Sequence, residues 1–345
     1  MSREITLVGI SNLPRIADRA DGRDNNFNLI RMLAAMGVLV SHAYPISLGP
    51  NTPEPLSDIL SGTTLGMICV MVFFSISGFF ISRSFEQTHN IKYFLRARAL
   101  RLFPALVIVL AVTIAVSAIF FTSALPKIFW LGASEYFMRN LMLFFPKYPL
   151  PGVFEANPFG PAINGSLWTL NYEVLCYLGV VLCGILGLLG RPAAFAVWLM
   201  LFLLLYAVAQ VQPLHSRFEN LAQLGLPFSI GMSFWVWRSI IPLSWPLAAV
   251  ALVVVALLRP TPVFDFALAV ALTYGIFVLG YTRLNPLEGY NRLGDFSYGT
   301  YVYSFPLQQL IASFGVVSPL TNIALAFPAV LICAILSWFF VEKPA

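Results

Sequence analysis

The stretch "RMLAAMGVLVSH" at residues 31–42 lies inside a longer apolar run and carries one ionisable side chain at each end. Ten uncharged residues separate Arg31 from His42. Eleven positions are close to three turns of α-helix, so the two side chains fall on nearly the same face, about 16 Å apart along the axis. That distance is about half the thickness of a bilayer core. The stretch therefore predicts a membrane helix with a cation near one surface and a titratable group deep inside.

The composition of the whole chain indicates a polytopic membrane protein. The 345 residues are 59% hydrophobic and only 10% charged, whereas soluble domains carry about 25% charged residues. We attribute the net charge of +5 to cytoplasmic loops and expect no nucleic-acid partner. The four cysteines lie in apolar runs without metal-ligand spacing, so we expect small buried side chains and no metal site.

We predict an all-α fold with about ten transmembrane helices. Ten apolar runs have about the 17 to 25 residues that are needed to cross hydrocarbon. They cover residues 27–48, 63–83, 101–122, 166–189, 193–210, 221–238, 242–258, 263–281, 297–316 and 320–341.

The distribution of basic residues predicts the orientation. With the N-terminus inside, fifteen of the 20 lysines and arginines fall on the cytoplasmic side, which favours N-in and C-in. Residues 1–26 then form a cytoplasmic N-terminal segment without the apolar core of a cleavable signal peptide, and residues 27–345 form the transmembrane domain. The loop 123–165 is external. Its apolar stretch 136–145 is too short to span, so we expect an interfacial or re-entrant helix there.

Two ionisable side chains stand well inside the predicted spans, where charges are costly. His42 lies roughly 9 Å below the outer end of its span, and Glu173 lies roughly 10 Å below the outer start of its own. These similar depths predict a pair in which the carboxylate fixes the imidazole tautomer. The same pair could also serve only to hold two helices together. Nearby polar side chains predict a polar cavity at this level: Trp168, Asn171 and Tyr172.

A basic cluster, "RARALR" at residues 96–101, precedes the third predicted span. Arg98 and Arg101 are three positions apart, so on a helix they are neighbours on one face. The cluster is typical of an orientation signal, but two guanidinium groups also suit phosphate binding. Together with Arg31 they could hold a phosphorylated cytosolic ligand. An elongated donor such as a coenzyme A thioester would then reach from these arginines to His42.

Six segments of the chain resemble motifs of the integral-membrane acyltransferase-3 family, which O-acylates sugars and other acceptors on bacterial surfaces. The resemblance covers nearly the whole chain, with the motifs in the family's order. The segments are "NNFNLIRMLAAMGVLVSH" (25–42), "VFFSISGFFIS" (72–82), "RARALRLFP" (96–104), "SLWTLNYEVLCYL" (166–178), "FSYGTYVYSFPLQQ" (296–309) and "VEKP" (341–344).

The resemblance implies an O-acyltransferase, most simply an O-acetyltransferase, of the bacterial inner membrane. Its donor would be acyl-CoA, most simply acetyl-CoA, with no permanently bound cofactor. Its acceptor would be a hydroxyl of a surface polysaccharide or lipid-linked glycan. Arg31, Arg98 and Arg101 would bind the donor, while His42 would act as general base or carry the acyl group and Glu173 would orient it. Three residues would contact the acceptor: Trp168, Asn171 and Tyr172.

One position departs from the family pattern. Many members have a histidine in the late "SY…H.P" element, where this chain has Ser304. The position therefore has no predicted catalytic role.

Two other functions stay open. Ten spans with a buried His and Glu also suit a proton-coupled transporter or flippase for an anionic solute, although the inverted repeat expected of many such folds is not evident. A scaffold of a polysaccharide-export complex would leave His42 and Glu173 unexplained. Membrane lipids are expected partners, and partners in polysaccharide biosynthesis or a second copy of the chain stay open.

Overall fold

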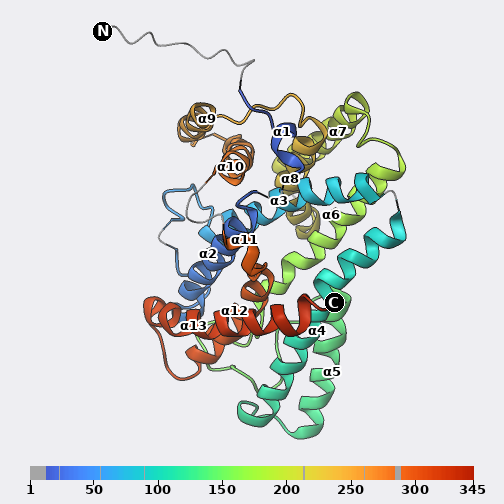
Figure 1. Ribbon diagram of the computed structural model, residues 1–345. Helices are drawn as coiled ribbons and strands as arrows, with labels where there is room; N and C mark the ends of the chain where they lie inside the picture. The colour runs from blue at the N-terminus through green and yellow to red at the C-terminus, as the bar shows by residue number, and fades with distance from the viewer. Residues whose placement is uncertain are drawn as a thin grey trace. The chain divides into compact units, whose positions relative to one another are not determined.

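The computed structural model describes residues 13–22, 24–54, 56–88, 90–212, 214–259, 261–283 and 289–345. This part of the chain is helical and contains no strand, and every predicted apolar run overlaps a helix (Figure 1). These helices are α2 (Phe27–Leu48), α3 (Leu65–Thr88), α4 (Ile91–Phe120), α6 (Trp168–Ile185), α7 (Pro192–Val211), α8 (Ser216–Val236), α9 (Trp245–Leu258), α10 (Phe264–Tyr281), α12 (Ser297–Ala312) and α13 (Pro319–Ser337).

The predicted all-α membrane fold is confirmed. Within the described residues, seven helices are long and apolar enough to cross a membrane: α2, α3, α4, α6, α7, α10 and α13. The apolar range of α6 begins at Gly165, and that of α13 extends to Glu342. Helix α9 has 14 residues and α12 has 16, which is short for a span. Helix α8 (Ser216–Val236) carries the charged residues Arg217 and Glu219 in its first turn. The count of ten spans and the N-in orientation stay predictions.

Two helices extend beyond the apolar runs that predicted them. Helix α4 begins at Ile91, ten residues before the apolar run, because Asn90 caps it by accepting a hydrogen bond from the Tyr93 amide at 3.1 Å. Helix α5 (Pro126–Met142) covers most of the stretch 136–145, where a helix was expected, and its interfacial position stays a prediction. It starts at a proline and ends where Leu143 adopts a positive φ of 62°. The short helices are α1 (Ala17–Ala20), α11 (Tyr290–Leu293), the 3₁₀ helix η2 (Gly165–Leu167) and the π-helix η4 (Trp338–Glu342).

The chain forms two compact units, each assembled from distant segments of sequence. Unit 1 takes Met1–Ile30, Phe74–Gln87 and Val180–Arg292. Unit 2 takes Arg31–Phe73, Thr88–Gly179 and Leu293–Ala345.

Unit 1 is packed around α8, which contacts α7 and α10, while α9 packs on α10. Glycines allow the α3 segment of this unit to approach α8 very closely. A Cβ atom on Gly78 would lie 2.0 Å from the Phe228 carbonyl oxygen, and one on Gly231 would lie 2.1 Å from the Ser75 carbonyl oxygen. Small residues at such crossings are typical of membrane helix packing.

The described N-terminal residues of unit 1 are bonded to the rest of that unit through backbone and side-chain hydrogen bonds. The Ile16 amide donates to the Ile241 carbonyl at 3.1 Å. The Asn26 side chain donates to two carbonyls at the end of α10, those of Leu279 at 3.0 Å and Thr282 at 2.6 Å. The Asn26 bonds engage carbonyl groups at the C-terminal end of α10, where a helix leaves carbonyls unpaired.

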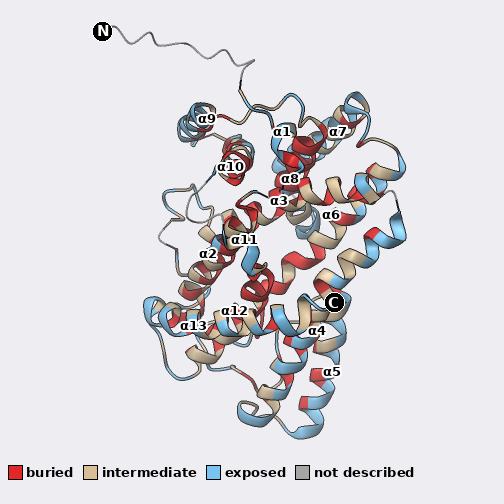
Figure 2. Ribbon diagram, in the orientation of Figure 1, coloured by how far each residue is buried: buried red, intermediate tan, exposed pale blue. Residues whose placement is uncertain are grey.

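Unit 2 is built around α12, which contacts α13, α4 and η2. Figure 2 shows α12 buried along most of its length, whereas α4, α5 and α13 also carry exposed residues. Helix α5 packs against α4. Every residue predicted to take part in chemistry or binding belongs to unit 2.

Candidate functional site

Three hydroxyl side chains of α12 donate hydrogen bonds to backbone carbonyls of unit 2. The Tyr298 hydroxyl donates to the Leu102 carbonyl at 2.9 Å, and the Tyr301 hydroxyl donates to the Ser166 carbonyl at 3.0 Å. Ser304 donates to the Tyr301 carbonyl of its own helix at 3.0 Å. These bonds matter because a buried hydroxyl without a partner would cost about 1–3 kcal/mol. The bond to the Tyr301 carbonyl uses the proton of the Ser304 hydroxyl.

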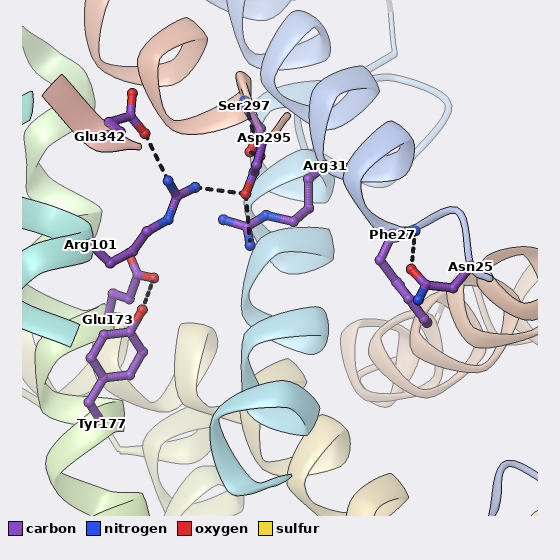
Figure 3. Close-up of polar contacts among 9 residues, drawn as sticks. All are labelled: Asn25, Phe27, Arg31, Arg101, Glu173, Tyr177, Asp295, Ser297 and Glu342. Atoms are coloured by element: carbon purple, nitrogen blue, oxygen red, sulfur yellow. Dashed lines mark hydrogen bonds and ion pairs between the residues drawn. The ribbon is translucent and has the colours of Figure 1, made fainter. Parts of the chain in front are cut away.

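Arg31 and Arg101 converge on one carboxylate, that of Asp295 (Figure 3). Arg101 binds Asp295 at 2.7 Å and, through its other terminal nitrogen, Glu342 at 2.8 Å. Arg31 lies 3.4 Å from the same Asp295 oxygen. Ser297 donates to Asp295 from both its amide, at 3.2 Å, and its hydroxyl. Two largely buried carboxylates, whose side chains are 13% and 1% exposed, thus hold Arg101 in place.

Asp295 is a permanent anion in this network. It precedes α12 and lies outside the seven membrane-spanning segments found in the described chain. Burial alone would raise the pKa of its carboxyl, but Arg31, Arg101 and the Ser297 hydrogen bonds lower this pKa to about 2. The carboxylate therefore stays ionised at any pH in which a cell grows.

Arg98 differs from its neighbour Arg101, although the sequence predicts an equivalent pair. Both lie on α4, but Arg98 forms no ion pair with any residue that the structure describes. Its Nε atom is buried without a hydrogen-bond partner, and its guanidinium lies 5.9 Å from the centre of the Phe94 ring. It interacts electrostatically with Glu173, Arg101 and Arg31. Arg98 is thus available to an anionic ligand, whereas Arg101 is held by carboxylates.

Glu173 lies on the arginine side of unit 2. Its carboxylate accepts a hydrogen bond from the Tyr177 hydroxyl, one helical turn further along α6 (Figure 3). It also interacts electrostatically with Arg98, Tyr298 and Tyr301. Sequence reasoning missed Tyr177, although the spacing of four residues places it on the same helix face as Glu173.

His42 packs against α12 and not against Glu173. Its ring meets the Phe305 ring edge to face, with 5.1 Å between centroids, and its Nδ1 atom is buried without a hydrogen-bond partner. The expected contact between His42 and Glu173 is not among the contacts of the described residues. A depth argument gives only a height in the membrane, and two residues at one height can face different helices.

A second carboxylate, which sequence reasoning did not single out, lies beside α2. Glu54 is buried, and its two oxygens accept hydrogen bonds from the Ser41 hydroxyl and, at 3.1 Å, from the Leu65 amide. Ser41 directly precedes His42 in the sequence. Glu54 therefore ties the C-terminal part of α2 to the first residue of α3.

The three residues predicted to contact an acceptor lie in the first turns of α6. Trp168 and Tyr172 pack edge to face with 5.7 Å between ring centroids. Asn171 is buried, and its Oδ1 atom has no hydrogen-bond partner. The arrangement provides an aromatic pair next to an unused hydrogen-bond acceptor.

The cysteines agree with the expected apolar role. All four are free thiols, three of them buried and Cys333 partly exposed. No group of three or more metal-ligating side chains is found within the described ranges.

Comparison with known proteins places these features in one family. The model of a family described as "Acyltransferase domain", the acyltransferase-3 family, matches residues 24–342. The chain is 29% identical to the protein named O-acetyl transferase from Shigella phage Sf6, over 93% of this chain and 96% of that protein. It is 25% identical to Nodulation protein 10 from Rhizobium leguminosarum bv. viciae, over 95% of each chain. No solved structure matches the chain.

Proposed function

Because the chain belongs to the acyltransferase-3 family, we propose that it is an O-acyltransferase that uses acyl-CoA, most simply acetyl-CoA. The acceptor is a hydroxyl of a surface polysaccharide or lipid-linked glycan. The similarity to a protein named O-acetyl transferase supports the acetyl group. The proposed location is the bacterial inner membrane, where a cytosolic donor can reach the arginines.

The observation that carries the donor assignment is the unequal pairing of the three arginines. Binding a phosphate requires a guanidinium that is not already neutralised by carboxylates. Arg101 is neutralised by Asp295 and Glu342, and Arg31 lies at 3.4 Å from the shared Asp295. Arg98 therefore contributes most of the donor affinity, with Arg31 assisting it.

Glu173 and Tyr177 support the same donor site in this proposal. Their hydrogen bond keeps a carboxylate close to Arg98 without forming an ion pair with it. An incoming phosphate competes easily with such a partner. The role proposed for Glu173 is thus to position Arg98.

His42 supplies the base in the proposed reaction. Its Nε2 atom accepts the proton of the acceptor hydroxyl while the hydroxyl oxygen attacks the thioester carbonyl carbon. The carbon–sulfur bond breaks, and the departing thiolate takes the proton from the imidazolium. The separation of about 16 Å along the helix between Arg31 and His42 suits a donor with phosphates at one end and a thioester at the other.

The acceptor enters, in this proposal, next to the first turns of α6. The edge-to-face pair of Trp168 and Tyr172 offers apolar ring surface to a sugar. The unused Oδ1 atom of Asn171 can accept a hydrogen bond from a sugar hydroxyl.

The test is release of free CoA from acyl-CoA by the purified protein, with a glycan acceptor supplied. We expect His42→Ala to abolish transfer while the protein stays folded. We expect Arg98→Ala to raise the KM for acyl-CoA roughly ten- to hundredfold, as for loss of a charge-assisted hydrogen bond, without changing the Tm.

Arg101→Ala is the matched control, because it lies one turn away and should lower the Tm instead. A wild-type KM in Arg98→Ala would contradict the donor assignment. Uptake of a labelled anion into liposomes without any acyl-CoA would support a transporter instead.

A further inference from the structure

Helices α2 and α12 meet along a seam that is defined by two neighbouring contacts. The Gln308 Nε2 atom donates to the Leu39 carbonyl at 2.9 Å, and the His42 ring packs on the Phe305 ring. Leu39 and His42 are three residues apart on α2, and Phe305 and Gln308 are three residues apart on α12. Residues three apart share one helix face. The imidazole and the amide therefore occupy the same seam.

Each of these two groups holds a polar atom that lacks a partner. Nδ1 of His42 and Oε1 of Gln308 are both buried and without a hydrogen bond. The bond to Leu39 fixes which end of the Gln308 amide is the donor, because a carbonyl only accepts. The free end is thus an acceptor, and leaving it unpaired costs about 1–3 kcal/mol. A neutral imidazole protonated on Nδ1 is the complementary donor.

The carboxylates of Glu173 and Glu54 are already engaged by other donors. Glu173 accepts from Tyr177, and Glu54 accepts from Ser41 on one oxygen and from a backbone amide on the other. The Oε1 atom of Gln308, by contrast, accepts no hydrogen bond from the described residues.

Gln308 is also held firmly enough to position another residue. Its side chain is fully buried, and Asn322 of α13 donates to its main-chain carbonyl at 3.1 Å. Leu39, which receives the amide hydrogen bond, packs against Ala326 and Val330 of α13. A group that orients a base must itself be fixed in this way.

We propose that Gln308 is the positioning residue of His42, accepting a hydrogen bond from Nδ1–H through Oε1, loosely in the resting protein and closely when substrates are bound. Hydrogen bonds of this kind are often long or poorly aligned without substrate and tighten in the reactive complex. The bond holds the tautomer in which Nε2 carries the lone pair, as the third member of a catalytic triad does. This inference rests on the proposed function of His42 as a base.

The proton balance follows from that tautomer. Nε2 takes the proton of the acceptor hydroxyl, and the resulting imidazolium keeps its Nδ1–H bond to Gln308. The acceptor oxygen bonds to the thioester carbon, the carbon–sulfur bond breaks, and Nε2 returns the proton to the thiolate. The imidazole ends in its starting tautomer.

Gln309 provides a matched control because it is an adjacent glutamine with a different task. Its Nε2 atom donates to the carbonyls of Phe159 at 3.0 Å and Ala162 at 2.7 Å. Its Oε1 atom accepts from Asn157 at 2.8 Å. All its hydrogen bonds thus fix the external loop and none is left for His42.

The direct test is nitrogen NMR of the ¹⁵N-histidine-labelled full chain in detergent. The chain has three histidines, so His89→Asn and His215→Asn leave His42 as the single reporter. We expect the Nδ1–H tautomer in this background, and a shift toward Nε2–H in Gln308→Leu. Gln308→Glu keeps an acceptor and should keep the Nδ1–H tautomer. Gln309→Leu should leave the tautomer unchanged.

In the transfer assay we expect Gln308→Leu to lower kcat roughly tenfold to hundredfold with the KM for acyl-CoA unchanged. The same tautomer in Gln308→Leu as in the background would overturn the proposal, and so would an equal shift in Gln309→Leu. The tautomer is measured without donor or acceptor. A protein that shows the tautomer shift but transfers no acyl group would therefore refute the proposed function and leave the pairing intact.

Discussion

Replacing Asp295 by asparagine removes the charge that Arg31 and Arg101 share. The folded protein lowers the pKa of Asp295 from 3.8 to about 2. Each unit of pKa corresponds to about 1.4 kcal/mol, so the ionised carboxylate contributes about 2 kcal/mol to stability at neutral pH. The variant also deprives Arg31 of the ion pair seen in the described structure. We therefore expect a loss of about 2 kcal/mol or more.

The sign of the pH dependence follows from the direction of the shift. The folded pKa lies below the unfolded one, so the contribution is complete above about pH 4 and is lost as the pH falls toward 2. Thermal unfolding of the wild type and Asp295→Asn, at one scan rate in one detergent, measures this from pH 7 to pH 2.5. The two proteins should converge in acid.

Asp265→Asn is the control, because Asp265 is an exposed aspartate in the first turn of α10. It should lose only the smaller interaction of a carboxylate with a helix N-terminus, about 0.3–1 kcal/mol. Equal stability of Asp295→Asn and the wild type at pH 7 would refute the reasoning, as would a difference that grows on acidification.

Two glycine substitutions test close approaches in the two units. In Gly78→Ala the new Cβ would lie 2.0 Å from the Phe228 carbonyl oxygen, and because backbone cannot move aside easily we expect a loss of about 1–3 kcal/mol; a Tm equal to that of the wild type would contradict this. In Gly165→Ala the new Cβ would lie 2.6 Å from the Phe305 ring, which supports His42. We expect that variant to fold but to lose about tenfold in kcat, and wild-type turnover would show that the ring does not position the base.

Hydropathy predicted the helices well because the backbone of a lipid-exposed segment must satisfy its own hydrogen bonds. Every predicted run overlaps a helix for this reason. The beginning of α4 was wrong by ten residues, because residues 91–100 are polar enough to escape a hydropathy search but form helix nonetheless. Hydropathy detects lipid contact and not helix as such.

The sequence identified the basic residues of the site but not the difference between them. Arg98 and Arg101 look equivalent in "RARALR", and the carboxylates that distinguish them lie far along the chain. Asp295 is 194 residues from Arg101, and Glu342 is 241 residues away. Local spacing carries no information about such partners.

Local spacing could not identify the proposed partner of His42 either. Glu173 stands at a matching depth, but Gln308 is the residue on the facing helix that reaches the backbone one turn before His42. The signal was present in the sequence, since Gln308 belongs to the quoted segment "FSYGTYVYSFPLQQ". Recognising it requires knowing that α12 faces α2, which only the tertiary structure provides.

The short and polar sequence of α12 also bears on how the protein is inserted into the membrane. Its 16 residues carry many polar side chains, and hydrocarbon alone does not retain so short and polar a helix. Its stability comes from contacts with α13, α4 and η2. Helix α13 is synthesised last of these. We therefore expect α12 to settle in the bilayer only after α13 has left the ribosome, so that the two helices enter the membrane as one hairpin.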